Sequence, residues 1–179
     1  MNPQILSAAN YALAALTIAA QVFLVLIGAS YLFWRNKFSE QFLWLSKNGM
    51  ALAFLVALFS MLASLFYSNI AGFEPCVLCW YQRIFMYPLV FLLGVALAKK
   101  SRQIIDYILP LPVIGFLIAL YHCYIYYFAS AGCQLAGRGV SCTQRYVFEF
   151  GYITIPLMAL TAFALVIVLL VFANLDKHE

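Results

Sequence analysis

The stretch EPCVLCWYQRIFMYPLVFLLGVALA, from Glu74 to Ala98, places two cysteines three positions apart just before an apolar run. The run from Trp80 to Ala98 is close to the roughly 20 residues that a helix needs to cross a bilayer. A C-x-x-C pair in a water-soluble protein usually indicates a thioredoxin-like redox site or half of a zinc site. Here the pair lies instead at the start of a predicted membrane span.

Four further stretches of the chain are also long and apolar enough to span a membrane. The five predicted spans are Tyr11–Trp34, Gly49–Asn69, Trp80–Ala98, Ile104–Phe128 and Tyr152–Ala173. Of the 179 residues, 66% are apolar and 9% are charged, whereas a soluble domain has about 25% charged residues. The sequence therefore predicts an all-α integral membrane protein. The first run is expected to be a retained helix, because Met1–Asn10 has no basic residue and the run exceeds a signal-peptide core.

The distribution of Lys and Arg predicts the orientation, because cytoplasmic loops of membrane proteins carry an excess of these residues. One side of the five spans holds seven of them: Arg35, Lys37, Lys47, Lys99, Lys100, Arg102 and Lys177. The other side holds three: Arg83, Arg138 and Arg145. The N-terminus is therefore predicted outside and the C-terminus in the cytoplasm. The net charge of +4 is explained by basic residues in the predicted cytoplasmic loops and does not indicate nucleic-acid binding. Membrane lipid is therefore the expected partner, and nucleic acid is not.

Four of the five cysteines fall on the predicted outer side. Cys76 and Cys79 lie in the first outer loop, Cys133 and Cys142 lie in the second, and Cys123 lies inside a span. Structural disulfides would suit the second loop, but a bridge between the close pair would restrain almost no chain. Closely spaced C-x-x-C pairs are more often redox-active. A zinc site from all four outer cysteines is a third interpretation, although the nine-residue step in the second loop is loose for structural zinc.

The close cysteine pair is expected at the N-terminus of a helix. Pro75 biases the residue before it toward extended backbone, and the unpaired N–H groups and dipole of a helix start favour a thiolate. If the helix starts near Cys76, then Cys79 and Arg83 follow on the same face. Arg83 would stabilise a thiolate and attract an electron-rich ring oxygen, or it would only extend to the lipid headgroups. An arginine inside a span is costly, which favours the functional interpretation.

His122, in the segment LYHCYIYYF, is another polar residue in the predicted outer half of the membrane. It either hydrogen-bonds a neighbouring helix or serves a proton-coupled electron carrier, because imidazole changes charge near neutral pH. Its neighbour Cys123 is expected to be a small buried residue that the activity does not need. The chain has no Gly-rich nucleotide fingerprint and no pair of histidines placed for haem. By elimination, the electrons of a dithiol are expected to pass to a quinone in the lipid.

Three features together resemble the DsbB family of membrane thiol oxidases, most of all its BdbC branch. They are the run CVLCWYQRIFMYP from Cys76 to Pro88, a cysteine pair in the next outer loop, and GYITIPLMAL at the start of the last span. The resemblance covers roughly Gly49 to Ala173. It implies a four-helix bundle in the bacterial cytoplasmic membrane that reoxidises a thioredoxin-fold partner of the DsbA or BdbD kind outside the cytoplasm. It also implies that the electrons pass to ubiquinone or menaquinone.

The resemblance further implies roles for individual residues. Cys76 and Cys79 would be the quinone-facing pair, and Cys133 and Cys142 would be the partner-facing pair. The partner's thiolate would attack Cys133, and Cys142 would exchange with Cys76, which relays electrons to Cys79. Arg83 matches the family's quinone-contacting arginine.

His122 matches a histidine at the corresponding height in relatives. The chain departs from the family in its additional first span. We therefore expect two parts: residues 1–48 as an extra transmembrane helix with a cytoplasmic loop, and residues 49–179 as the four-helix bundle with two extracytoplasmic cysteine loops. A stripe of small residues suited to close helix packing marks the extra helix: Ala8, Ala12, Ala15 and Ala19.

Three other functions remain open at this level. An enzyme similar to vitamin K epoxide reductase also couples thiols to quinones, although its C-x-x-C usually lies late in the chain. A non-catalytic membrane subunit would keep its cysteines as structural disulfides. A metal carrier would bind zinc or copper in its reduced form.

Overall fold

The structure, a computed structural model, describes residues 3–33, 39–128 and 141–175. Regular structure in these ranges is helical, apart from an isolated bridge between Glu149 and Ile153. In chain order the elements are α1 (Pro3–Phe33), α2 (Ser39–Leu65), the π-helical turn η1 (Phe66–Ile70), α3 (Val77–Ala98), α4 (Ile105–Ile108), α5 (Pro110–Phe128) and α6 (Ile155–Leu175). Five helical segments of the described chain are long and apolar enough to cross a membrane: Gln4–Ser30, Leu43–Ile70, Val77–Ala98, Ile105–Phe128 and Ile155–Asn174. The predicted all-α membrane fold with five spans is confirmed.

The helices extend beyond the predicted spans at several ends. α1 begins at Pro3 instead of Tyr11, and α2 begins at Ser39 instead of Gly49. Lys47 therefore lies on a helix and not in the loop in which the sequence placed it. Hydropathy predicts only the part of a helix that lies in the lipid, so it does not detect the polar turns at the helix ends. The fourth span is divided at Pro110, whose ring removes a backbone N–H donor and suits the first turn of a new helix.

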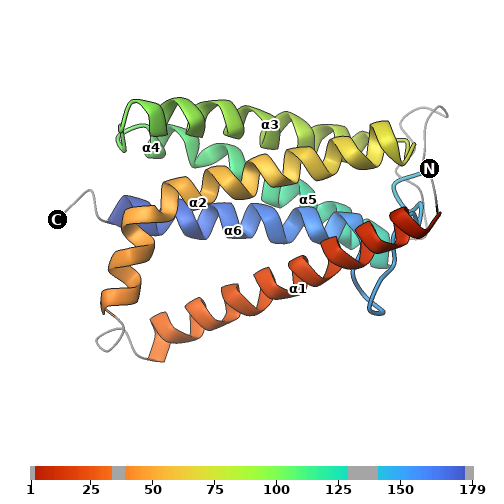
Figure 1. Cartoon of the computed structure of the whole chain (residues 1–179), viewed down its shortest axis with the longest axis horizontal. Coiled ribbons are helices and arrows are strands. Elements are labelled where there is room, and N and C mark those ends of the chain that lie inside the picture. Colours follow the sequence, from red (N-terminus) through yellow and green to blue (C-terminus); the bar gives the residue numbers. More distant parts are fainter. Residues whose placement is uncertain (1–2, 34–38, 129–140, 176–179) are drawn as a thin grey trace.

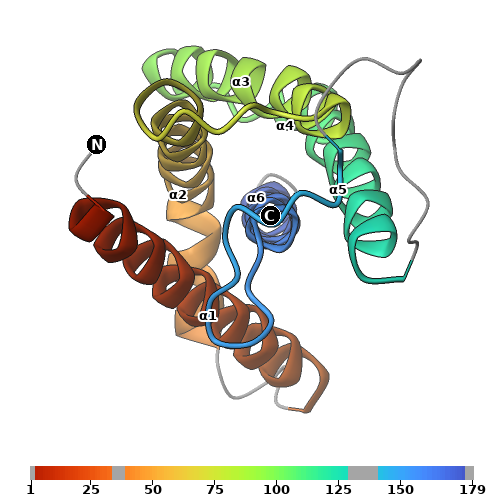
Figure 2. The same ribbon diagram turned by 90° about the vertical axis from the view of Figure 1, so that its right-hand side faces the viewer.

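α6 is the central helix of the bundle. It packs against α2, α5 and α1, while α3 closes the bundle between α2 and α5 (Figure 2). Small residues permit the closest helix approaches. A Cβ atom on Gly49 of α2 would lie 2.5 Å from the Leu169 carbonyl oxygen of α6, and one on Gly115 of α5 would overlap the ring of Phe163.

α1 runs at a tilt along the side of this bundle and packs mainly against α6 (Figure 1). Its buried face carries Asn10, Ala14 and Thr17, which follow one another at helical spacing. The alanine stripe predicted for close packing is not this face, because Ala8, Ala12, Ala15 and Ala19 are exposed. Two polar residues and one alanine thus take the place of the expected small-residue seam.

The cysteine pair lies at the end of the bundle opposite a group of four basic residues, Lys47, Lys99, Lys100 and Arg102. Cys76 precedes the first residue of α3, and Lys99 and Lys100 follow its last. Arg102 lies at the same end as Lys47, because its Nη2 donates to the Lys47 carbonyl at 3.1 Å. The start of α1 and the end of α6 also lie at opposite ends (Figure 1). The separation of charge that the topology prediction requires is therefore present within one bundle.

Candidate redox site

Cys76 begins α3 as its N-cap residue. Its backbone is extended, with φ −70° and ψ 171°, and its sulfur accepts a hydrogen bond from the Cys79 backbone N–H at 3.4 Å. A serine, threonine or aspartate oxygen usually fills this role, and here a thiol does. Pro75 restricts the chain just before the cap. The expected helix start at the C-x-x-C pair is therefore observed.

The two sulfurs of the pair are unequal. Cys76 is buried and Cys79 is half-buried, and their Sγ atoms lie 2.9 Å apart as thiols. The hydrogen bond to Cys79 and burial together raise the pKa of Cys76 to about 12, against a smaller lowering influence of His122. Cys76 therefore keeps its proton and donates it toward the sulfur of Cys79. The expectation that the helix N-terminus favours a thiolate does not hold for Cys76, because these two effects outweigh its cap position.

His122 of α5 links both cysteine-bearing segments. It is buried, and its Nε2 lies 3.2 Å from the Cys142 carbonyl oxygen and 3.7 Å from the Cys76 sulfur. Its Nδ1 lies 3.3 Å from the amide nitrogen of Gln82. Because a carbonyl only accepts and an amide NH₂ only donates, Nε2 carries the hydrogen and Nδ1 accepts. Of the two roles predicted for His122, hydrogen bonding to a neighbouring helix is observed.

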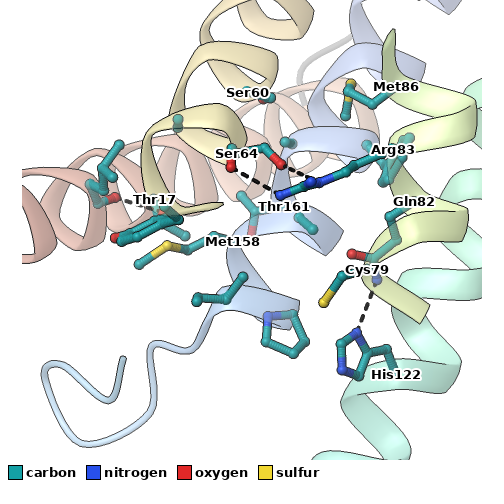
Figure 3. Close-up of a pocket in the computed structure, with 18 of the residues that line it drawn as sticks. Thr17, Ser60, Ser64, Cys79, Gln82, Arg83, Met86, His122, Met158 and Thr161 are labelled. Carbon is teal, nitrogen blue, oxygen red and sulfur yellow. Dashed lines mark hydrogen bonds between the residues drawn. The ribbon is translucent and has the colours of Figure 1, made fainter. Parts of the chain in front are cut away.

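Arg83 turns toward α2. Its Nε donates to the Ser64 hydroxyl at 3.0 Å, and its Nη2 donates to the Ser64 carbonyl at 3.1 Å (Figure 3). The Tyr87 hydroxyl also donates to Ser64 Oγ at 3.3 Å, and the guanidinium lies 5.1 Å from the centre of the Trp80 ring. The side chain is thus fixed between two helices, with its charge inside the protein, and is not simply extended toward the headgroups.

A cavity of about 530 Å³ opens beside these residues. Its side on α3 and α5 is polar and includes Cys79, Gln82, Arg83 and His122. The opposite side is mostly apolar and comes from α1, α2 and α6, including Leu16, Phe23, Leu55, Phe59 and Leu165. Figure 3 shows Thr17 of α1 across the cavity from Cys79 and Arg83. We call this space the dithiol cavity.

Sequence reasoning missed several residues of the site. Gln82 follows Cys79 by three positions and so shares its helix face, which the spacing could have shown. Ser64 carries no signal in the sequence, because its role depends on how α2 packs against α3. The contribution of α1 to the cavity was also missed, since the extra helix appeared to be separate from the chemistry.

The structure brings one cysteine of the second loop to the first pair. Cys142 is buried and packs in one cluster with Cys76, Leu78 and Ile125. Cys133 lies outside the described residues, so its predicted pairing with Cys142 stays a prediction. Cys123 is buried and is not among the residues that line the dithiol cavity.

Two kinds of ligand suit the residues that are present. The Sγ atoms of Cys76 and Cys79 and a ring nitrogen of His122 lie within 4.8 Å of one another, a soft donor set that zinc or copper accepts. A quinone also fits. The cavity volume lies within the roughly 300–1,000 Å³ of small-molecule pockets, and one polar side with a fixed guanidinium faces a lipid-like opposite side.

Comparison with known proteins agrees with this arrangement. The sequence model of the family "Disulfide bond formation protein DsbB" matches residues 46–173. The "Disulfide bond formation protein C" of Bacillus subtilis is 42% identical over 129 residues, which cover 71% of this chain and 93% of that protein. A "Probable disulfide formation protein C" of Bacillus cereus is 54% identical over 104 residues, which cover 57% of this chain and 74% of that protein. No solved structure matches the chain significantly.

The family match leaves α1 outside and includes both cysteine-bearing segments described above. The family match covers most of the chain, and the relatives are matched over most of their own length. Membership implies an oxidoreductase role, and the helices make this a multi-pass membrane protein. The chain belongs to the DsbB family of disulfide bond formation proteins.

Proposed function

We propose that the chain is a membrane protein-dithiol:quinone oxidoreductase. It reoxidises an extracytoplasmic thioredoxin-fold partner of the DsbA or BdbD kind and passes the electrons to ubiquinone or menaquinone in the bacterial cytoplasmic membrane. The observation that carries the proposal is the place of Cys79. It lines the mostly apolar dithiol cavity beside Arg83, and its partner Cys76, which also lines the cavity, packs with Cys142 of the second loop.

The first half of the proposed reaction is thiol–disulfide exchange. The partner's thiolate attacks Cys133 of a Cys133–Cys142 disulfide, which forms a mixed disulfide and releases Cys142 as a thiolate. Cys142 attacks Cys76, which forms a Cys76–Cys142 disulfide and leaves the electron pair of the broken bond on Cys79. The partner's second thiol then attacks its own sulfur in the mixed disulfide, so that the partner leaves oxidised and Cys133 is reduced.

The second half restores both disulfides. Cys133 attacks Cys142, which re-forms the loop disulfide and releases Cys76. The Nε2–H of His122, 3.7 Å from the Cys76 sulfur, stabilises the departing thiolate until it takes up a proton. The resulting dithiol, with the proton on Cys76, matches the arrangement of the two thiols described above. Closure of the Cys76–Cys79 disulfide releases two electrons and the Cys76 proton.

The polar residues of the dithiol cavity would hold a quinone ring next to Cys79. Arg83 is fixed by Ser64 with its charge available to a ring oxygen, and Gln82 and His122 supply the remaining polar surface. A bound quinone supplies a two-electron acceptor that also takes up two protons. The apolar residues opposite Cys79 exclude water from the site.

The proposal is tested with purified protein, a reduced thioredoxin-fold partner and a quinone analogue, by following thiol loss and quinol formation together. We expect Cys79→Ser to abolish quinone reduction and Cys123→Ser to leave it intact. Equal loss in both variants, or no thiol consumption by the unaltered protein, would overturn the proposal.

A second experiment separates the proposal from its rivals. A Cys142→Ser variant should accumulate a mixed disulfide between Cys133 and the partner in cells, because the exchange with Cys76 is blocked. Mass spectrometry of the trapped complex should find a thioredoxin-fold protein. A structural subunit would trap nothing.

A metal carrier is the second candidate, favoured by the three donor atoms at Cys76, Cys79 and His122. A metal carrier would bind one zinc or copper ion per reduced chain. If such binding occurs without quinone reduction, the metal function replaces the proposed one.

A further inference from the structure

The helix outside the family region supplies one wall of the dithiol cavity. The family match begins at residue 46, well after the end of α1. Nevertheless, six residues of α1 line the cavity: Leu13, Leu16, Thr17, Ala19, Ala20 and Phe23. They face residues of α2 and α6, so that the cavity lies between α1 and the four helices of the family region.

Polar contacts fix α1 on both sides of this wall. Toward its start, the buried Tyr67 hydroxyl donates to the Asn10 side-chain oxygen at 3.0 Å. Toward its middle, Gln21 donates to the Thr161 hydroxyl of α6 and accepts from the Tyr152 hydroxyl, both at 3.1 Å. Hydrogen bonds between helices are specific in position and rotation, unlike contacts between apolar side chains in lipid. The register of α1 against the cavity is therefore set.

The exposure of lining residues on α1 and α2 indicates that the cavity opens toward lipid between these two helices. Leu16 and Phe23 of α1 and Phe59 of α2 line it, yet each remains between 40% and 50% exposed. Only apolar or weakly polar side chains flank this opening, whereas Arg83 and His122 lie on the far side beside Cys79. The cavity thus leads from the bilayer to the dithiol, with its polarity increasing along the way.

We propose that α1 completes the acceptor site by binding the isoprenoid tail of the quinone between α1 and α2. This inference rests on the proposed function, because it takes the ring to lie at Cys79 and Arg83. A tailed quinone would then lie with its apolar chain across Leu16, Ala20 and Phe23 and leave toward the lipid at the opening. The extra helix makes the enzyme selective for acceptors that carry a tail.

Matched tryptophan substitutions test the inference. Ala20 is half-buried and lines the cavity, whereas Ala12 on the same helix is exposed and does not. In Ala20→Trp the KM for a tail-bearing quinone should rise about tenfold, a usual effect of losing apolar contacts in a binding pocket. The KM for a quinone ring without a tail should stay within about twofold of its original value, and Ala12→Trp should change neither value. Unchanged KM values in Ala20→Trp, or an equal rise for both acceptors, would overturn the inference.

Photolabelling of the unaltered protein gives a second measurement, which depends neither on a variant nor on turnover. A quinone with a photoreactive group in its tail should label α1 within residues 13–23, and excess unlabelled tailed quinone should suppress the labelling. Labelling of other helices with none on α1 would overturn the inference. Failure of the proposed function looks different, because the unaltered protein would then reduce neither kind of quinone.

Discussion

The two thiols of Cys76 and Cys79 are made unequal by their places on one helix. Cys76 caps α3, is buried and packs against Cys142, whereas Cys79 lies one turn later and is only half-buried; both line the dithiol cavity. The proton shared across their 2.9 Å contact lies on Cys76. The hydrogen bond between the two thiols, the burial of Cys76 and the nearby His122 together set this asymmetry.

The raised pKa of Cys76 predicts a pH effect in a variant. In the reduced protein Cys76 is protonated below about pH 12, because its hydrogen bond to Cys79 and its burial disfavour the thiolate. Cys79→Ala removes the larger cause, so the pKa of Cys76 should fall toward the ordinary value of 9.0. Each unit of this fall increases the thiolate fraction at about pH 8 roughly tenfold. Site-resolved alkylation across pH, read by mass spectrometry, should show Cys76 reacting at lower pH than in the unaltered protein.

The same alkylation series carries its own control. Cys123 is buried and does not contact the pair, so its reaction profile should be identical in both proteins. If the pH dependence of Cys76 alkylation is the same in Cys79→Ala as in the unaltered protein, burial alone keeps the thiol protonated.

Ser64 is predicted to act as a positioning residue for Arg83. Ser64→Ala removes the hydroxyl that accepts hydrogen bonds from Arg83 Nε and from Tyr87. The guanidinium then keeps only one of its two hydrogen bonds to Ser64, the one to the carbonyl. A hydrogen bond to a charged group contributes about 1.5–3 kcal/mol, so the KM for quinone should rise about tenfold or more. The kcat and the exchange with the partner in the absence of quinone should not change.

Two further variants show whether Ser64 acts through its hydroxyl. Ser64→Thr retains the acceptor and should restore the KM. Ser7→Ala makes the same chemical change on an exposed turn of α1, where the hydroxyl bonds only to the Gln4 carbonyl. A general loss of stability in Ser64→Ala, with a fall in kcat and no rescue by threonine, would indicate a purely structural role.

At the scale of elements, patterns within one helix were predictable from the sequence, and contacts between helices were not. The five spans follow from hydropathy, and the shared face of Cys79 and Arg83 follows from helical spacing. Ser64 and the pocket-lining face of α1 depend on how helices rotate against one another, which apolar residues in lipid do not specify. The alanine stripe was misleading for the same reason, because the hydrogen bond that Asn10 accepts from Tyr67 and the one that Gln21 donates to Thr161 decide the rotation of α1.

Close packing of α2 on α6 predicts a difference between two helical glycines. Gly49→Ala places a Cβ 2.5 Å from the Leu169 carbonyl oxygen and 3.1 Å from Ala173 Cβ, so the helices must separate. Overpacking of this kind costs about 1–3 kcal/mol. Gly28→Ala on α1 meets nothing within 4 Å and should be neutral or slightly stabilising. Thermal unfolding in detergent should show a lower midpoint for Gly49→Ala and not for Gly28→Ala. Equal midpoints would mean that the α2–α6 contact accommodates the added methyl group without loss of stability.

Over the whole molecule, a group of four basic residues and the cysteine pair lie at opposite ends of the bundle. Lys47, Lys99, Lys100 and Arg102 gather at one end, and the cysteine pair lies at the other. If all five of these helices cross the membrane, the start of α1 and the end of α6 lie on opposite sides, and the extra helix reverses the N-terminus without moving the cysteines. Under the proposed function, such a bundle would exchange thiols at one end and take up quinone from the side.

The positive-inside distribution predicts the direction of this arrangement. By their positions in the sequence, seven of the ten Lys and Arg residues fall on the side predicted to lie opposite the cysteines, and such an excess keeps loops in the cytoplasm because basic residues resist translocation. A fluorescent protein fused after Glu179 should therefore be bright, and alkaline phosphatase fused there should be inactive. Fusions before Met1 should give the opposite pair of results. The reason is that α1 adds a fifth span to the four of the family region, which places the N-terminus on the other side of the membrane from the C-terminus. Exchanging Lys99 and Lys100 for Gln is the sharper test: because five basic residues remain at that end against three at the other, the orientation should hold. An active phosphatase after Glu179 in the unaltered chain would place the cysteines in the cytoplasm and remove the basis for an extracytoplasmic partner.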